Sequence, residues 1–141
     1  AEARPAYGRE RFQELALASI PIHGAISAGG LVEAWQEDLG SLEIPSRILQ
    51  EAPRAFGLRV YGNSLASEWI YEGAVVVVDP DAPFADGKIY AVRVEGGEVA
   101  ARRVYDAGRV FKLVTGQGQV DEYPKRTVSL IGRVRWSFRE H

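Results

Sequence analysis

The chain has 141 residues, no cysteine and a formal net charge of -2, and 46% of its residues are hydrophobic. These values are typical of one globular domain, and they exclude disulfides, thiolate catalysis and cysteine metal sites. The lack of a basic excess argues against a nucleic-acid-binding domain. The longest apolar run, residues 74–78, is far shorter than the roughly 20 residues of a spanning helix. We therefore expect no membrane contact. With only two histidines, His23 and His141, we expect no metal site, and we expect no cofactor.

The first third of the chain predicts little regular structure. Residues 9–19 are expected to form a short helix or linker, because their apolar side chains recur at spacings of three and four. The sequence contains no methionine, so we expect residues 1–19 to be a linker remnant and residues 20–141 to be the domain itself. Residues 28–53 are less regular and predict a loop with a strand-like stretch at 31–35.

Six runs rich in β-branched and aromatic residues predict strands. They span residues 57–61, 74–78, 89–94, 99–105, 110–114 and 128–138. Gly, Pro and Asp residues separate the runs, and Gly96-Gly97 and Asp106-Ala107-Gly108 each indicate a hairpin loop. One short helix is expected near residues 64–69. Many closely spaced strands predict an all-β fold, with antiparallel sheets that form a partly open barrel or sandwich.

The sequence Gly62-Asn63-Ser64 follows one of these strands directly. Glycine permits a sharp turn at this point, and the free N–H groups of a helix start can stabilise a developing oxyanion. Ser64 is therefore a candidate nucleophile. Taken alone, the same pattern is more often an ordinary helix N-cap, so both interpretations stay open on this motif.

The order of several motifs resembles the LexA-type repressors, the UmuD proteins and the phage repressors, which share a self-cleaving serine peptidase domain. That family carries, in order, an Ala-Gly cleavage site, a Gly-x-Ser-Met motif, an acidic-Gly-Asp turn before an apolar strand, and a Glu-x-x-x-Lys-Arg strand. The matching segments here are Ser27-Ala28-Gly29-Gly30, Gly62-Asn63-Ser64-Leu65, Glu72-Gly73-Ala74, Asp86-Gly87-Lys88 and the run from Glu98 to Arg103. The match extends over residues 20–138, and several motifs in one order are more specific than any one of them.

The resemblance implies a role for each matched residue. Ser64 would attack the Ala28–Gly29 peptide bond of its own chain. The backbone amides of Asn63 and Ser64 would form the oxyanion hole, with Gly62 and Glu98 supporting the site. These assignments are expectations carried over from the family, position by position.

The resemblance also implies an assembly. We expect a cytoplasmic homodimer formed through the C-terminal strand, residues 128–138. A RecA filament is the possible co-protease of such a protein, which would repress genes of the DNA-damage (SOS) response. DNA binding would come only from a helix-turn-helix domain that precedes this chain.

One departure from the family is serious, because Arg102 stands where the family has its general-base lysine. A lysine accepts the serine proton only when it is neutral, which burial favours. An arginine, with a pKa above about 12, stays cationic at pH 7. Shifting the register does not recover a lysine, since Ala101 and Arg103 flank the position. We therefore expect cleavage to be absent or slow at pH 7. An engineered substitution, a natural non-cleaving regulator and a peptidase that works slowly at high pH all stay open.

Other functions fit parts of the pattern. An UmuD-like accessory protein of a translesion polymerase would lack a DNA-binding domain, and a phage-repressor-like module would dimerise without cleaving. A signal peptidase shares the serine-lysine chemistry but needs a membrane anchor. In a plain β-barrel interaction domain the Gly-x-Ser pattern would be a coincidence. A helix-turn-helix in the parent reading frame would favour a repressor over an UmuD-like protein.

Overall fold

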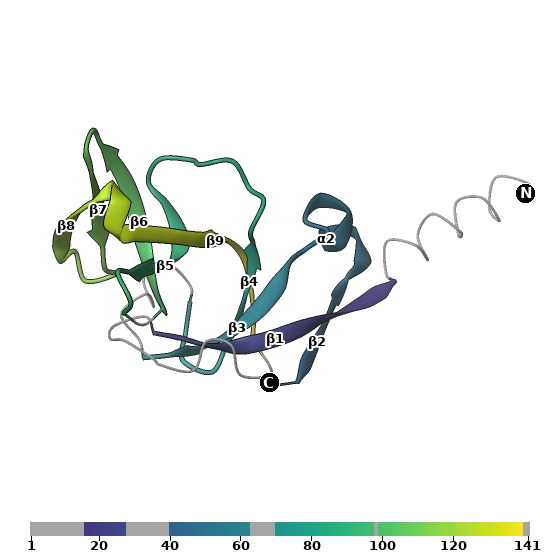
Figure 1. The fold of residues 1–141 in the computed structure, drawn as a ribbon. Coiled ribbons are helices and arrows are strands. Elements are labelled where there is room, and N and C mark those ends of the chain that lie inside the picture. Colours follow the sequence, from purple (N-terminus) through teal and green to yellow (C-terminus); the bar gives the residue numbers. More distant parts are fainter. Residues whose placement is uncertain (1–15, 28–39, 63–69, 98, 140–141) are drawn as a thin grey trace, which may run out of the picture.

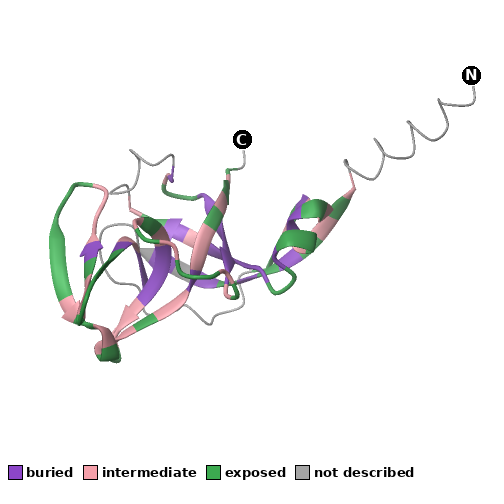
Figure 2. Cartoon of the chain, turned by 90° about the horizontal axis from the view of Figure 1, so that it is seen from above, coloured by how far each residue is buried: buried purple, intermediate pink, exposed green. Residues whose placement is uncertain are grey.

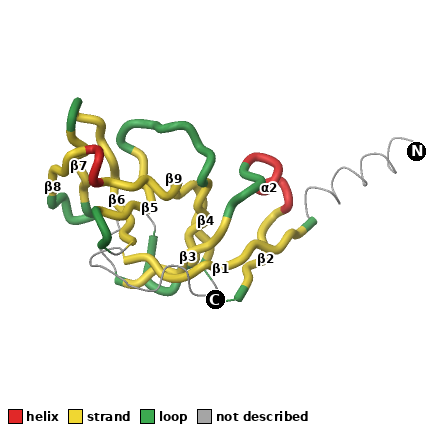
Figure 3. The backbone as a smooth tube through the Cα atoms, in the orientation of Figure 1, coloured by secondary structure: helices red, strands yellow, loops and turns green. Residues whose placement is uncertain are grey.

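The computed structural model describes residues 16–27, 40–62, 70–97 and 99–139. Strands dominate this part of the chain, with one short α-helix and one 3-10 turn (Figure 3). In chain order the elements are β1 (Leu17–Ser27), β2 (Ser41–Pro45), α2 (Ser46–Glu51), β3 (Phe56–Tyr61), β4 (Val75–Asp79), β5 (Lys88–Val94), β6 (Val99–Ala107), β7 (Val110–Val114), β8 (Val120–Pro124), η2 (Lys125–Thr127) and β9 (Val128–Phe138). The predicted all-β fold is confirmed. Among these elements, no helix is both long and apolar enough to cross a membrane.

The nine strands form one mixed sheet in the order β2-β1-β3-β4-β9-β5-β6-β7-β8. The sheet is not closed into a barrel, because its end strands β2 and β8 do not pair with each other. Most neighbours are antiparallel, as predicted, but β1 runs parallel to β3 and also meets β6 in parallel at a single pair, Ser27 with Ala100. In Figure 1, β2 and α2 lie at one end of the molecule, β7 and β8 lie at the other, and β1 runs from the first end toward the second.

Three apolar clusters hold the sheet together. The first contains Ile26, Leu58, Val60, Val76, Val78, Val99 and Ala101, among others. The second joins α2 and β2 to β4 through Ile20, Ile44, Ile48, Ala52, Ala55 and Val77. The third lies on the β5–β7 side and contains Tyr90, Val92, Val104 and Leu113. Figure 2 shows the buried residues concentrated on the central strands, while the edges are exposed.

The uninterrupted apolar run in β4 follows from its place in the sheet. All five residues of β4 are buried, with Val76 and Val78 in the first cluster and Val77 in the second. A strand covered on both faces needs apolar side chains at every position rather than at alternate ones. The position of β4 therefore explains why its sequence shows no alternation.

All six predicted strands are present, as β3, β4, β5, β6, β7 and β9. The strands β1, β2 and β8 and the helix α2 were not predicted. The helix or linker expected at 9–19 is wrong for Leu17–Ser19, which begins β1 and pairs with β2. The loop expected at 28–53 is wrong for 41–51, which forms β2 and α2. The helix expected at 64–69 and the strand-like stretch at 31–35 lie outside the described residues.

Gly132 on β9 has no room for a side chain. A Cβ at this position would lie 2.6 Å from Val78 Cγ1 and 2.9 Å from the carbonyl oxygen of Asp79. We expect Gly132→Ala to lower the free energy of unfolding by about 1–3 kcal/mol, because a packed core resists added volume. Urea denaturation would measure the loss. In a Val78→Ala background, Gly132→Ala should still cost most of this free energy, because the Asp79 carbonyl oxygen stays in place. If Gly132→Ala costs nothing in that background, the backbone contact is not the cause.

Candidate active site

β3 delivers the chain to Gly62 in the conformation of a sharp turn. Gly62 has a φ of +83°, which glycine adopts without the steric cost that a Cβ would bring. Its N–H donates to Oε1 of Glu72 at 3.4 Å. The residues before the Gly-x-Ser motif thus form the abrupt strand end that the sequence predicted. Asn63 and Ser64 themselves lie outside the described residues.

The turn around Gly73 folds back onto the end of β3. The N–H of Gly73 donates to the carbonyl of Val60 at 2.9 Å, and the N–H of Val60 donates to the carbonyl of Ala74 at 2.8 Å. Where the family has Asp, Ala74 closes the turn through its backbone N–H, which donates to the carbonyl of Tyr71 at 3.0 Å. The turn therefore forms without an Asp side chain at position 74, and it places Glu72 beside Gly62.

The parallel strands β1, β3 and β6 meet at one point of the sheet. Ser27, the last residue of β1, pairs with Tyr61 at the end of β3 and with Ala100 on β6. Arg102 follows Ala100 by two residues on β6. The strand that leads to the predicted cleavage site, the strand that leads to Gly62 and the strand that carries Arg102 are therefore neighbours at this point. Ala28, Gly29 and Glu98 lie outside the described residues.

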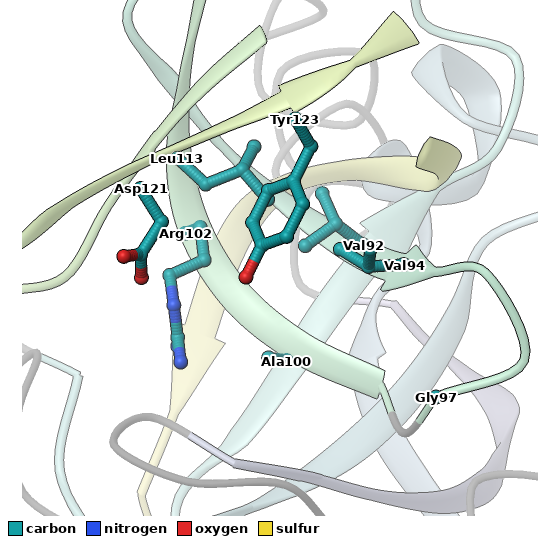
Figure 4. Close-up of a pocket in the computed structure, with 8 residues that line it drawn as sticks. All are labelled: Val92, Val94, Gly97, Ala100, Arg102, Leu113, Asp121 and Tyr123. Carbon is teal, nitrogen blue, oxygen red and sulfur yellow. The ribbon is translucent and has the colours of Figure 1, made fainter. Parts of the chain in front are cut away.

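Arg102 lies on the face of β6 that carries Ala100, beside the third apolar cluster. Its Nη1 donates to the carbonyl of Ala101 at 2.7 Å. The side chain borders a cavity of about 110 Å³, shown in Figure 4. The cavity is lined by Val92, Val94, Gly97, Ala100, Arg102, Leu113, Asp121 and Tyr123. The Arg102 side chain thus faces a small pocket rather than open solvent.

The surroundings of Arg102 act on its charge in two directions. Burial lowers the pKa of the Arg102 guanidinium from its ordinary value, while Asp121 and Tyr123 oppose that shift by favouring the cation. Both neighbours come from β8, which the sequence analysis missed. They reach Arg102 because β8 pairs with β7 and β7 pairs with β6. Such a long-range pairing leaves no local signal in the sequence.

The chain's three lysines are placed elsewhere. Lys112 pairs with Glu122 at 3.7 Å, and Lys125 pairs with Asp106 at 2.6 Å. Lys88 begins β5 opposite Val104. None of the three lysines stands at position 102, where the resemblance predicts the general base. In the described ranges, no group of three or more His, Asp or Glu residues could hold a metal ion.

A family model described as Peptidase S24-like matches residues 21–135 of this chain. The chain belongs to the Peptidase S24-like family. This result confirms the resemblance drawn from the motif order, since it is a family of self-cleaving serine peptidases.

Curated relatives agree with this membership. The chain is 26% identical over 133 residues to the LexA repressor of Bacillus mycoides (strain KBAB4), covering 94% of this chain and 65% of the relative. It is 27% identical over 135 residues to the LexA repressor of Bacillus cytotoxicus, covering 94% and 66%. The LexA repressor of Bacillus thuringiensis (strain Al Hakam) is 27% identical over 121 residues, covering 86% and 59%. This S24-like chain therefore spans somewhat less than two thirds of the relatives it matches.

Proposed function

We propose that this chain is the dimerisation and latent self-cleavage domain of a LexA-like repressor of the DNA-damage response. In this proposal Arg102 makes cleavage absent or slow at neutral pH. A helix-turn-helix domain precedes this domain and is joined to it through the residues before β1, and a RecA filament serves as co-protease in the cytoplasm. The observation that supports the proposal best is the position of Ser27, between the end of β3 and the strand that carries Arg102.

The proposed chemistry requires the Ser64 hydroxyl to lose a proton as its oxygen attacks the carbonyl carbon of Ala28. The amides of Asn63 and Ser64 would stabilise the oxyanion that forms. The proton must then reach the nitrogen of Gly29, which leaves when the peptide bond breaks, and water must hydrolyse the resulting Ser64–Ala28 ester to free the fragment that ends at Ala28. A neutral lysine can carry this proton, whereas a guanidinium already holds its full set of protons. Losing a general base costs a factor of about 10²–10⁴ in rate.

An intact-mass time course of the wild-type chain tests the cleavage part directly. At pH 7 we expect no fragment that begins at Gly29. At pH 10.5 a slow appearance of that fragment, lost in Ser64→Ala, would identify a peptidase limited by proton removal. Rapid cleavage by the wild-type chain at pH 7 would overturn the proposed effect of Arg102.

The proposed dimer rests on an edge of β9. The strand pairs with β5 from Val128 to Arg133 and with β4 from Arg133 to Phe138. In the part of the chain that the structure describes, no strand pairs with the second edge of residues 134–138, and residues 128–132 likewise pair only with β5. An unpaired edge invites a strand of another molecule, and two copies can satisfy each other about a two-fold axis. Each half of β9 therefore has one such edge, and we propose the C-terminal half, residues 134–138, as the centre of the dimer contact.

Two serines on β9 allow a matched test of this contact. Ser137 and Ser129 are both exposed, but only Ser137 lies in the half of the strand proposed to pair with its copy. We expect Ser137→Lys to weaken dimerisation at least tenfold, about 1.4 kcal/mol, because it places like charges across the interface. Ser129→Lys should leave the dimer unchanged. Analytical ultracentrifugation would measure both, and an equal effect of the two variants would refute this interface.

A further inference from the structure

The cavity beside Arg102 has an apolar half. Val92 and Val94 from β5, Leu113 from β7 and Ala100 from β6 form its walls, and Val92 and Leu113 belong to the third apolar cluster. Its volume is about 110 Å³, whereas a dry cavity of about 150 Å³ takes a benzene molecule. On this scale the whole cavity takes about four carbons, so a ligand can place a compact side chain of three or four carbons inside it and must keep its polar end at the rim.

The other half of the cavity is polar and carries both signs of charge. In Figure 4 the polar ends of Arg102, Asp121 and Tyr123 gather on one side of the space, while Val92 and Val94 lie on the other side. A guanidinium matches a carboxylate, and a carboxylate accepts hydrogen bonds from an ammonium group. A simple anion would meet the charge of Asp121, and a simple cation would meet the charge of Arg102. The pair favours a ligand that carries both charges at one end.

The location of the cavity also favours a ligand that carries both charges at one end. Arg102 is half-buried, and charges interact more strongly there than in water. Asp121 is exposed on β8, the outermost strand of its end of the sheet. A ligand can therefore approach from the β8 edge and place its apolar group inward.

We propose that this cavity binds a free aliphatic α-amino acid of the size of valine or leucine. The carboxylate pairs with Arg102, the ammonium group pairs with Asp121, the Tyr123 hydroxyl hydrogen-bonds the carboxylate, and the side chain fills the space between Val92 and Leu113. This site goes beyond the proposed function, because it requires neither Ser64 nor cleavage.

Isothermal titration of the intact chain with L-leucine and L-valine tests the proposal. We expect saturable binding of one molecule per chain. Leucinamide, which lacks the carboxylate, and N-acetyl-leucine, which lacks the ammonium group, should each bind at least tenfold more weakly, a loss of about 1.4 kcal/mol. N-acetyl-leucine binding as tightly as leucine would instead indicate a simple carboxylate site and overturn the proposal.

Neighbouring residues of β8 supply a matched pair of variants. Asp121 pairs across the sheet with Leu113, whereas Glu122 pairs with Lys112 on the opposite face. We expect Asp121→Asn to weaken leucine binding at least tenfold and Glu122→Gln to change it less than twofold. Both positions are exposed, so the fold should survive, and thermal unfolding would check this. No saturable binding below roughly 10 mM, about 2.7 kcal/mol of affinity, or equal binding by the two variants, would overturn the proposal without affecting the cleavage and dimer tests.

Discussion

Replacing Arg102 with lysine is expected to start cleavage between Ala28 and Gly29 at neutral to mildly alkaline pH. Burial at this position lowers the pKa of the cation, and a lysine has a much lower ordinary pKa than an arginine. The same surroundings therefore leave a lysine neutral far more often, and a neutral lysine can accept the serine proton. We expect a rate increase of about 10²–10⁴ over the wild-type chain. Intact-mass spectrometry would show fragments that end at Ala28 and begin at Gly29.

Two controls separate this effect from a general change in the chain. Ser64→Ala in the Arg102→Lys background should abolish the fragments. Arg103→Lys introduces the same side chain one residue along β6, where Arg103 points to the other face and its Nη1 donates to the carbonyl of Gly87 at 2.6 Å. The Arg103→Lys variant should not cleave the Ala28–Gly29 bond. If Arg102→Lys stays intact at every pH, the peptidase part of the proposed function is lost and the domain is a dimerisation module only.

Replacing Arg135 with alanine is expected to give the largest loss of stability among simple surface-accessible changes, about 2–4 kcal/mol. Arg135 lies at an irregularity of β9, where Trp136 pairs with Val77 but Val134 pairs with Val78. Its Nη1 donates to Oδ2 of Asp79 at 3.0 Å. Asp79 is only 4% exposed, so removing Arg135 leaves a buried carboxylate without its cation. Urea denaturation would measure the loss.

A second Arg–Asp pair nearby provides the control. Arg54 donates from Nε to Oδ2 of Asp81 at 2.8 Å, but the two side chains are 72% and 46% exposed. Pairs in water contribute little, so Arg54→Ala should cost less than about 1 kcal/mol. Both variants remove an Arg–Asp pair, but Arg135 also lies 3.9 Å from a carboxylate oxygen of Glu51 and 4.4 Å from the ring centre of Trp136, so its larger expected loss includes these contacts. Similar losses from Arg54→Ala and Arg135→Ala would contradict the role given to the burial of Asp79.

Much of this protein could be predicted from local sequence pattern. The six predicted strands are long or strongly β-branched, and their side chains alternate or run apolar according to how many faces are covered. The Gly62 turn was also predicted, because glycine is the residue that takes a positive φ at no cost. The order of the motifs indicated the family before any geometry was known. These features depend on neighbours in the chain, so the sequence alone determined them.

Tertiary structure decided the rest. β1, β2 and β8 were missed because their residues form strands only when partners from distant segments supply the second half of each pair. Ser27 meets Tyr61 and Ala100 through parallel pairing, and Asp79 meets Arg135 across 56 residues of sequence. Asp121 and Tyr123 approach Arg102 because β8 pairs with β7 and β7 pairs with β6. Local periodicity shows which face of a strand is buried, but the identity of the neighbouring strand and its register are fixed only by packing of the whole sheet.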